Sequence, residues 1–332
     1  MDRQQEQPLI GESQAFLEVL EHVSRVAQLN RPVLVIGERG TGTELVAARI
    51  HYLSPRWDRP FVKLNCATLA ETLLETELFG HEAGSFTGAT RRRLGRFELA
   101  NEGSMFLDEL ANTSDRVQEK VLRVIEYGEL ERVGGNDTIR TDVRIIGATN
   151  EDLPTLANEG KFRADLLDRL AFDVITLPPL RERQDDIMPL AQHFAVKMAG
   201  ELGMELFEGF SESARDLLMD YPWPGNVREL KNVVERAVYK SMGSDAVVKD
   251  IEFDPFDSPW RLGATKATEP DTTVAPTQAY DFKDHIQQTE IDLLKSALEQ
   301  NRYNQKKTAE FLGMTYHQLR GYLRKYDLTE ME

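Results

Sequence analysis

The chain has 332 residues, 41% of them hydrophobic, so it is long enough for two domains and can bury a sizeable core. Its formal net charge of −16 excludes a protein that binds nucleic acid through its overall charge, so any such contact must come from a local basic patch. The single cysteine excludes an internal disulfide, and the sequence has neither a membrane-spanning apolar run nor an N-terminal signal segment, so we expect a cytoplasmic protein.

Residues 11 to about 180 alternate short apolar runs with helical patterns. The expected strands are 33–37 (VLVIG), 61–66 (FVKLNC), 105–108 (MFLD), 143–148 (VRIIGA) and 172–177 (FDVITL). Each run is short and ends in polar or turn residues, which is typical of strands buried on both faces of a parallel sheet. Alternating strands and helices predict an α/β layered domain.

After Pro179 the pattern becomes helical, with expected helices over 186–200, 211–220 and 226–240. Residues 254–281 contain four prolines and many small polar residues, which indicates a linker. A last helical unit begins at residue 282, and its first helix is expected to carry an apolar stripe made of Phe282, Ile286, Leu293, Ala297 and Leu298. The sequence therefore predicts an α/β subdomain, a helical subdomain, a linker and a small all-α domain, over residues 8–178, 179–253, 254–281 and 282–332.

The segment GERGTGTE, residues 37–44, follows an expected buried strand and precedes an expected helix, as a phosphate-binding loop does. In such a loop the backbone N–H groups and the helix N-terminus bind phosphate oxygens. The predicted nucleotide-binding residues are Gly37, Glu38, Arg39, Gly40, Thr41, Gly42, Thr43 and Glu44. The alternative is a glycine-rich turn that binds nothing.

Thr43 stands where a phosphate-binding loop has a lysine, which supplies a positive charge to the β- and γ-phosphates. Losing one preorganised transition-state contact typically costs about 3–4 kcal/mol, so binding should survive better than turnover. Three explanations stay open. The protein hydrolyses ATP slowly, or a cation such as Arg39 or Arg49 partly substitutes, or the chain is a defective or engineered variant.

The segment SMFLDE, residues 104–109, is an apolar strand that ends in two carboxylates. Asp108 is placed to hold Mg²⁺, and Glu109 is placed to polarise the attacking water. Asn150 ends the next strand and is expected to reach the water or the γ-phosphate, although an ordinary turn asparagine is the simpler interpretation. An apolar strand followed by two acids is common, but its position about 65 residues after a phosphate loop makes the pattern specific.

Residues 302–325 contain six basic residues and one acid, which suits a DNA-binding helix-turn-helix. Gly313 is expected to make the turn, and Thr315 with Gln318 to cap the second helix. Leu319 and Leu323 should face inward. The predicted DNA-binding residues are Tyr316, His317, Gln318, Arg320 and Arg324. A basic, solvated helical hairpin is the alternative.

One ordered series of motifs resembles the sigma-54-dependent transcription activators, or bacterial enhancer-binding proteins, which are AAA+ ATPases. The series is LIGES, GERGTG, LFGHEAGSFTGA, FLDEL, VQEKVLRVIEYGELERVGG, FRADLLDRL, LPPLRER and WPGNVRELKNVVERAV. The resemblance implies a P-loop parallel sheet with a helical lid and a Fis-like helix-turn-helix domain. It also implies ATP and Mg²⁺ as ligands, and sigma-54 RNA polymerase, enhancer DNA and further copies of the chain in a hexameric ring as partners.

The resemblance also implies roles for particular residues. A loop that grips sigma-54 would comprise Gly84, Ser85, Phe86, Thr87, Gly88 and Ala89, with Ser85 where alanine is usual. Arg163 and Arg169 would act on the γ-phosphate of a neighbouring subunit, or else pair with Asp165 or Asp168 on their own helix. Arg228 would be the sensor arginine of the lid, and Asn65 would hold Glu109.

The leading hypothesis is therefore a DNA-bound ATPase that remodels sigma-54 RNA polymerase so that promoter DNA opens. The alternative is a hydrolysis-deficient nucleotide- and DNA-binding regulator, because of Thr43. A DNA-processing AAA+ motor is a third possibility, and GSFTGA argues against it. With no sensing domain ahead of residue 10, we expect control by a separate inhibitor protein that binds near Trp57.

Overall fold

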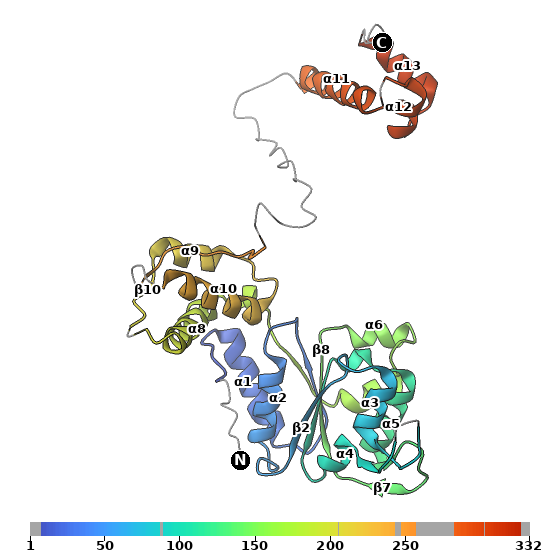
Figure 1. The fold of residues 1–332 in the computed structure, drawn as a ribbon, viewed down its shortest axis with the longest axis vertical. Coiled ribbons are helices and arrows are strands. Elements are labelled where there is room, and N and C mark those ends of the chain that lie inside the picture. The colour runs from blue at the N-terminus through green and yellow to red at the C-terminus, as the bar shows by residue number, and fades with distance from the viewer. Residues whose placement is uncertain are drawn as a thin grey trace. The chain divides into compact units, whose positions relative to one another are not determined.

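The computed structural model describes residues 8–86, 89–204, 206–242, 247–256, 282–301 and 303–326. The chain divides into two compact units, Met1–Pro255 and Phe256–Glu332. Figure 1 shows a sheet with helices and a helical lid in the first unit, and three helices in the second. Of the predicted linker, residues 257–281 lie outside the described part of the chain.

The sheet of the first unit is parallel and has the order β2-β5-β8-β1-β9. Its strands are β1 (Val33–Ile36), β2 (Phe61–Asn65), β5 (Ser104–Asp108), β8 (Arg144–Thr149) and β9 (Val174–Thr176). All five strands predicted from the sequence are confirmed, with ends that differ by at most two residues from the expected ones. The parallel α/β fold is confirmed as well.

Helices cover both faces of the sheet, with α1 and α2 on one side and α3 and α5 on the other (Figure 1). These helices are α1 (Gln14–Ala27), α2 (Thr43–Tyr52), α3 (Glu71–Phe79) and α5 (Asp115–Tyr127). Strand residues alternate between the two cores, because successive side chains of a strand point to opposite faces. Val33 and Val35 pack with α1 and α2, while Leu34 joins the core of α3 and α5.

Shorter elements complete the first unit. They include α4 (Arg96–Leu99), η1 (Leu110–Asn112), α6 (Leu153–Asn158) and α7 (Ala164–Leu170). Two antiparallel ribbons, which the sequence analysis did not predict, pair β3 (Gly80–His81) with β4 (Arg93–Leu94) and β6 (Glu129–Glu131) with β7 (Thr138–Arg140). The first ribbon forms the base of the segment that resembles the sigma-54 loop.

The lid is helical, as predicted, and packs around a fully buried tryptophan, Trp223. Its elements are η2 (Leu180–Glu182), η3 (Gln184–Asp186), α8 (Ile187–Glu201), α9 (Glu212–Asp220) and α10 (Asn226–Ser241), with β10 (Gly209–Phe210) paired to β11 (Val247–Val248). Pro222 and Pro224 separate α9 from α10 as expected.

The second unit consists of α11 (Phe282–Gln300), α12 (Gln305–Phe311) and α13 (Tyr316–Lys325). Leu319 and Leu323 are buried, Gly313 turns with φ of 65°, and Thr315 and Gln318 form the predicted capping box. On α11 the apolar stripe was expected to include Leu293, but Leu293 is 57% exposed and Leu294 packs in the core instead. The Phe282 and Ile286 side chains of that stripe lie outside the described residues.

Candidate functional site

The predicted phosphate loop joins β1 to α2 and has the backbone that such a loop needs. Gly40 and Gly42 have φ of 85° and 103°, a region that favours glycine, and Gly42 is the N-cap of α2. A Cβ on Gly37 would lie 2.7 Å from the Thr41 hydroxyl oxygen. Thr43 is the first residue of α2. The position that a lysine occupies in other phosphate loops therefore lies at the positive end of the helix.

The lid holds this loop through Glu38. Arg181 donates two hydrogen bonds to the Glu38 carboxylate, at 2.7 and 2.9 Å, and the Asn226 amide donates a third at 3.1 Å. The hydrogen bonds from Arg181 and then Asn226 lower the pKa of Glu38 to about 2. Glu38 was predicted to bind nucleotide, whereas here its carboxylate connects the loop to the lid.

Backbone contacts bring the lid still closer to the loop. The backbone N–H of Arg228 donates to the Gly40 carbonyl at 3.3 Å, and Arg183 donates to the Thr41 carbonyl at 3.2 Å. A Cβ on Gly40 would lie only 2.3 Å from the carbonyl oxygen of Gly225, so no other residue fits there. The predicted sensor residue Arg228 is therefore placed beside the loop, with an exposed side chain.

A cavity of about 280 Å³ opens between the loop and the lid. Its lining is mostly apolar, with four basic side chains and no acid, and consists of Pro8, Leu9, Ile10, Phe16, Thr41, Gly42, Leu45, Arg183, Leu190, His193, Phe194, Lys197, Val227 and Lys231. Such a cavity suits an anionic ligand with a flat apolar part, as in a nucleotide. Sequence analysis missed its lid residues, although the four-residue spacing of His193 and Lys197, and of Val227 and Lys231, put each pair on one helical face.

The two predicted catalytic carboxylates follow β5 at the same edge of the sheet. Asp108 is the last residue of the strand, and burial is the main cause that raises the pKa of its carboxyl. Glu109 has φ of 51°, so the chain turns sharply after the strand. Asn150 directly follows β8, which lies between β5 and β1, so its position is between the acids and the loop.

Asn65 contacts a different acid from the one expected. Its amide donates to the Asp108 carboxylate at 3.1 Å, and its own carbonyl oxygen accepts a hydrogen bond from the backbone of Ala67. Asn65 and Glu109 both lie in the described part of the chain, and no hydrogen bond joins their side chains as predicted. The physical reason is register, because Asn65 and Asp108 are directly paired across β2 and β5, whereas Glu109 has already left the strand.

The carboxylate set fits Mg²⁺ bound together with a substrate. Within the part of the chain that the structure describes, no three acidic, histidine or cysteine side chains cluster as a complete protein cage for a metal. Mg²⁺ commonly uses only one or two carboxylates, with phosphate oxygens and water as its other ligands. Asp108 is a partly buried carboxylate at the phosphate-facing edge and meets that requirement.

Both predicted trans-acting arginines are held within their own chain. Arg163 donates two hydrogen bonds to Asp165, at 2.7 and 3.1 Å, which is the intrachain pair considered as the alternative. Arg169 donates to Glu126 at 2.7 Å rather than pairing with Asp168. The Arg169 side chain is 60% exposed, so it stays accessible from outside the chain.

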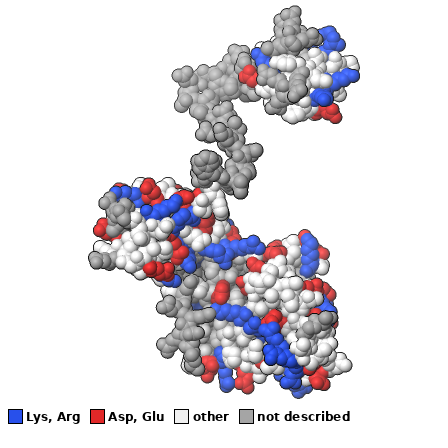
Figure 2. Space-filling model, in the orientation of Figure 1, with Lys and Arg blue, Asp and Glu red and all other residues white. Residues whose placement is uncertain are grey.

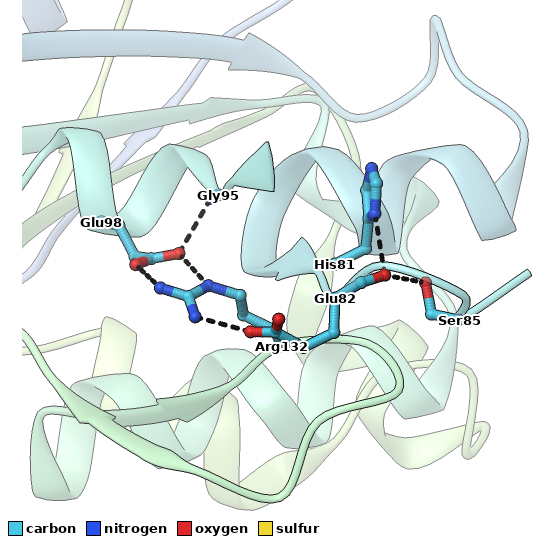
Figure 3. A network of polar contacts seen from close by, with 6 residues as sticks. All are labelled: His81, Glu82, Ser85, Gly95, Glu98 and Arg132. Carbon is cyan, nitrogen blue, oxygen red and sulfur yellow. Dashed lines mark hydrogen bonds and ion pairs between the residues drawn. The ribbon is translucent and has the colours of Figure 1, made fainter. Parts of the chain in front are cut away.

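The segment that resembles the sigma-54 loop stands on a partly buried polar network, shown in Figure 3. Arg132 donates to Glu98 at 2.6 and 3.0 Å and to Glu82 at 2.7 Å. The Ser85 hydroxyl donates to the Glu82 carbonyl at 2.8 Å, which ties the loop to this network. This bond needs the hydroxyl of Ser85 and would be lost with alanine.

The loop itself is narrow and presents an aromatic ring. The Gly84 N–H donates to the Ala89 carbonyl at 2.8 Å. Phe86 is 45% exposed, and its ring meets the edge of the His81 ring at 5.0 Å between centroids. Thr87 and Gly88, both predicted to contact sigma-54, lie outside the described residues.

The predicted DNA-reading helix is α13. His317, Arg320 and Arg324 are exposed on it, and Tyr316 is partly buried. Figure 2 shows lysine and arginine side chains on the visible face of this unit. The Gln318 side chain accepts a hydrogen bond from the Thr315 N–H at 2.9 Å, so this predicted DNA-binding residue also serves the helix cap.

Three protein-family models match consecutive parts of the chain. They are the sigma-54 interaction domain over residues 9–176, the AAA+ ATPase lid domain over 181–258, and the bacterial regulatory protein, Fis family, over 286–326. Among the described residues, no helix combines the length and apolar character needed to cross a bilayer.

Whole-chain relatives agree with these models. The Psp operon transcriptional activator of Escherichia coli (strain K12) is 58% identical over 320 residues, which cover 96% of this chain and 98% of that protein. The Nif-specific regulatory protein of Azotobacter vinelandii is 45% identical over 95% of this chain, which spans only 58% of that protein. The crystal structure of NtrX from Brucella abortus in complex with ATP matches with a TM-score of 0.69 and 32% identity, over 96% of this chain and 69% of that one.

Proposed function

Since this chain belongs to the sigma-54-dependent transcription activators, a family of AAA+ proteins that bind ATP, we propose that it activates the Psp operon. It binds DNA upstream of the promoter through α12 and α13 and uses ATP hydrolysis to remodel sigma-54 RNA polymerase. The observation that carries this proposal is the 58% identity over 98% of the Psp operon activator. The loop, the acid pair, the sigma-54 segment and the helix-turn-helix all lie inside the matched length.

The proposed ATP hydrolysis takes place at the carboxyl ends of the parallel strands. The N–H groups at the start of α2 hold the phosphates, and the cavity beside the loop takes the base and the sugar. Glu109 orients and polarises the attacking water, and Asn150, which follows the strand between the acids and the loop, assists it. Asp108 would hold Mg²⁺, which neutralises charge on the phosphates when it is bound.

The active form is a ring, which we propose to be a hexamer. Arg163 and Arg169 then leave their intrachain carboxylates and reach the γ-phosphate bound by the neighbouring subunit. The free chain keeps these arginines neutralised, so hydrolysis depends on assembly. Phe86 and Thr87 contact sigma-54 when the loop on the Arg132 network rises.

An inhibitor of the PspA type controls the ring from outside. Trp57 is 63% exposed, which supports it as part of the inhibitor's contact, because large exposed aromatic side chains are common at such surfaces. We propose this contact for Trp57 and cytoplasmic function for the whole protein.

The test is phosphate release from the purified chain with Mg-ATP, measured against protein concentration. A turnover per chain that rises with concentration supports an assembled ATPase. A chain that binds Mg-ATP in calorimetry but releases no phosphate at any concentration would instead be the hydrolysis-deficient regulator, which the comparisons do not support.

A further inference from the structure

The first turn of α2 carries an acid where a triphosphate has to bind. Glu44 follows Thr43 directly, and Asp108 and Glu109 lie at the same edge of the sheet. A loop lysine would offset this negative charge, and here the position is threonine. Three acids beside a polyanion would repel it strongly, because unit charges a few ångströms apart near a protein surface interact by several kcal/mol.

A lysine from another strand reaches this acid. Lys63 lies on β2, and its Nζ is 3.0 Å from Oε1 of Glu44. Lys63 and Asn65 are two residues apart, so both side chains leave the same face of the strand, and Asn65 contacts Asp108. Helix α2 packs across this face of β2, because the buried His51 of α2 stacks on Phe61 with 4.7 Å between the ring centroids. This packing brings Glu44 of α2 to Lys63 of β2.

Four arginines near the loop are placed less well for this task. Arg181 is bound to Glu38, and the buried Arg183 donates to the Thr41 carbonyl and lies over the Phe16 ring. Arg49 is six residues after Thr43, which is about 9 Å farther along the helix. Arg39 is exposed, and its backbone carbonyl accepts a hydrogen bond from Asn226 of the lid.

We propose that Lys63 is a positioning residue that neutralises Glu44 and so lets this loop accept a triphosphate without its own lysine. The proposal rests on the proposed function in one respect, namely that the chain binds ATP. Lys63 acts through Glu44 and not by contact with the phosphates. Its effect must therefore be smaller when Glu44 carries no charge.

The test is a double-mutant cycle read by calorimetry with ATP and ADP. Lys63→Gln is expected to weaken ATP binding about tenfold, and ADP binding less, because ADP carries less negative charge. Glu44→Gln alone strengthens ATP binding severalfold. In the double variant the loss caused by Lys63→Gln is smaller than in the unaltered chain, and Lys63→Arg retains most of the affinity.

Two further measurements separate this role from a merely structural one. The effect of Lys63→Gln should shrink at high salt, because exposed charges are screened, while the melting temperature stays unchanged. Lys240→Gln is the matched control, since Lys240 pairs with Glu252 near the C-terminal end of α10, far from the loop. It should leave both nucleotide affinities unchanged.

The outcomes are distinct. If the unaltered chain binds ATP and Lys63→Gln binds it equally well, the inference is wrong and the proposed function stands. If the loss is equally large in the double variant, Lys63 does not act through Glu44 and the inference is again wrong. If the unaltered chain binds neither nucleotide, both the inference and the ATP-dependent function fail.

Discussion

The proposed nucleotide site and the predicted DNA reader, which comprises α12 and α13, are built from residues at very different distances along the chain. In the reader, the cap of α13 joins Thr315 to Gln318, three residues away. In the nucleotide site, Glu38 is held by Arg181 and Asn226, which are 143 and 188 residues away. A substitution in the reader should therefore act locally, whereas one in the loop also changes how the lid is held.

The strongest way to separate the two regions is to remove the predicted general base. Glu109→Gln should lower phosphate release by a factor of about 10² to 10⁴, because it removes the group that activates water. Binding of Mg-ATP and of operator DNA should persist, as measured by calorimetry and by fluorescence anisotropy. Retained hydrolysis in this variant would assign the base to another residue.

Introducing a lysine at position 43 tests whether the missing charge limits ATP hydrolysis. Thr43→Lys should raise ATP hydrolysis at least tenfold, since a charge on the transferred phosphoryl group is typically worth about 3–4 kcal/mol. Steady-state phosphate release at fixed protein concentration measures the change. An unaltered chain that is already active, and that gains nothing from the lysine, would contradict this prediction.

A charge removed from the reader should leave the nucleotide site untouched. Arg320 is exposed on α13, and Arg320→Ala should weaken DNA binding about tenfold and reduce the salt dependence by about one phosphate contact. The affinity for ATP should not change. A loss of ATP affinity in this variant would show that the two regions are coupled rather than independent.

The smallest expected effect concerns a buried histidine of α2, the helix that follows the phosphate loop. His51 is fully buried and contacts the Ser104 hydroxyl at 3.0 Å, and burial lowers its pKa below the usual 6.5. As pH falls through 6.5, the unfolded chain gains a proton that the folded chain resists, so the free energy of unfolding decreases.

His51→Leu should reduce this loss of stability. The drop in melting temperature between pH 7.5 and 5.5 should be smaller by a few degrees than in the unaltered chain. Thermal denaturation at the two pH values checks it. An equal drop in both proteins would mean that other groups cause the acid sensitivity.

Most of the fold was predictable because its signals are local. The five strands are short apolar runs, and the lid helices have apolar residues at helical spacing with prolines between them. The two small ribbons were not predicted, because strands of two or three residues are too short to show an alternation of apolar and polar residues. Leu293 was misjudged for a related reason, since one position along a helix turns a side chain by about 100° and the neighbouring Leu294 faces the core.

By itself the sequence determined the order of the motifs, the local turns and the residue types available for chemistry, because these depend on neighbours along the chain. Which side chains meet depends on tertiary packing. Strand register pairs Asn65 with Asp108, and packing of the lid places Arg181 at Glu38. Packing of α2 on the sheet places Lys63 of β2 beside Glu44. Those contacts depend on how the sheet, its covering helices and the lid pack in three dimensions, and this packing cannot be read from residue spacing along the chain.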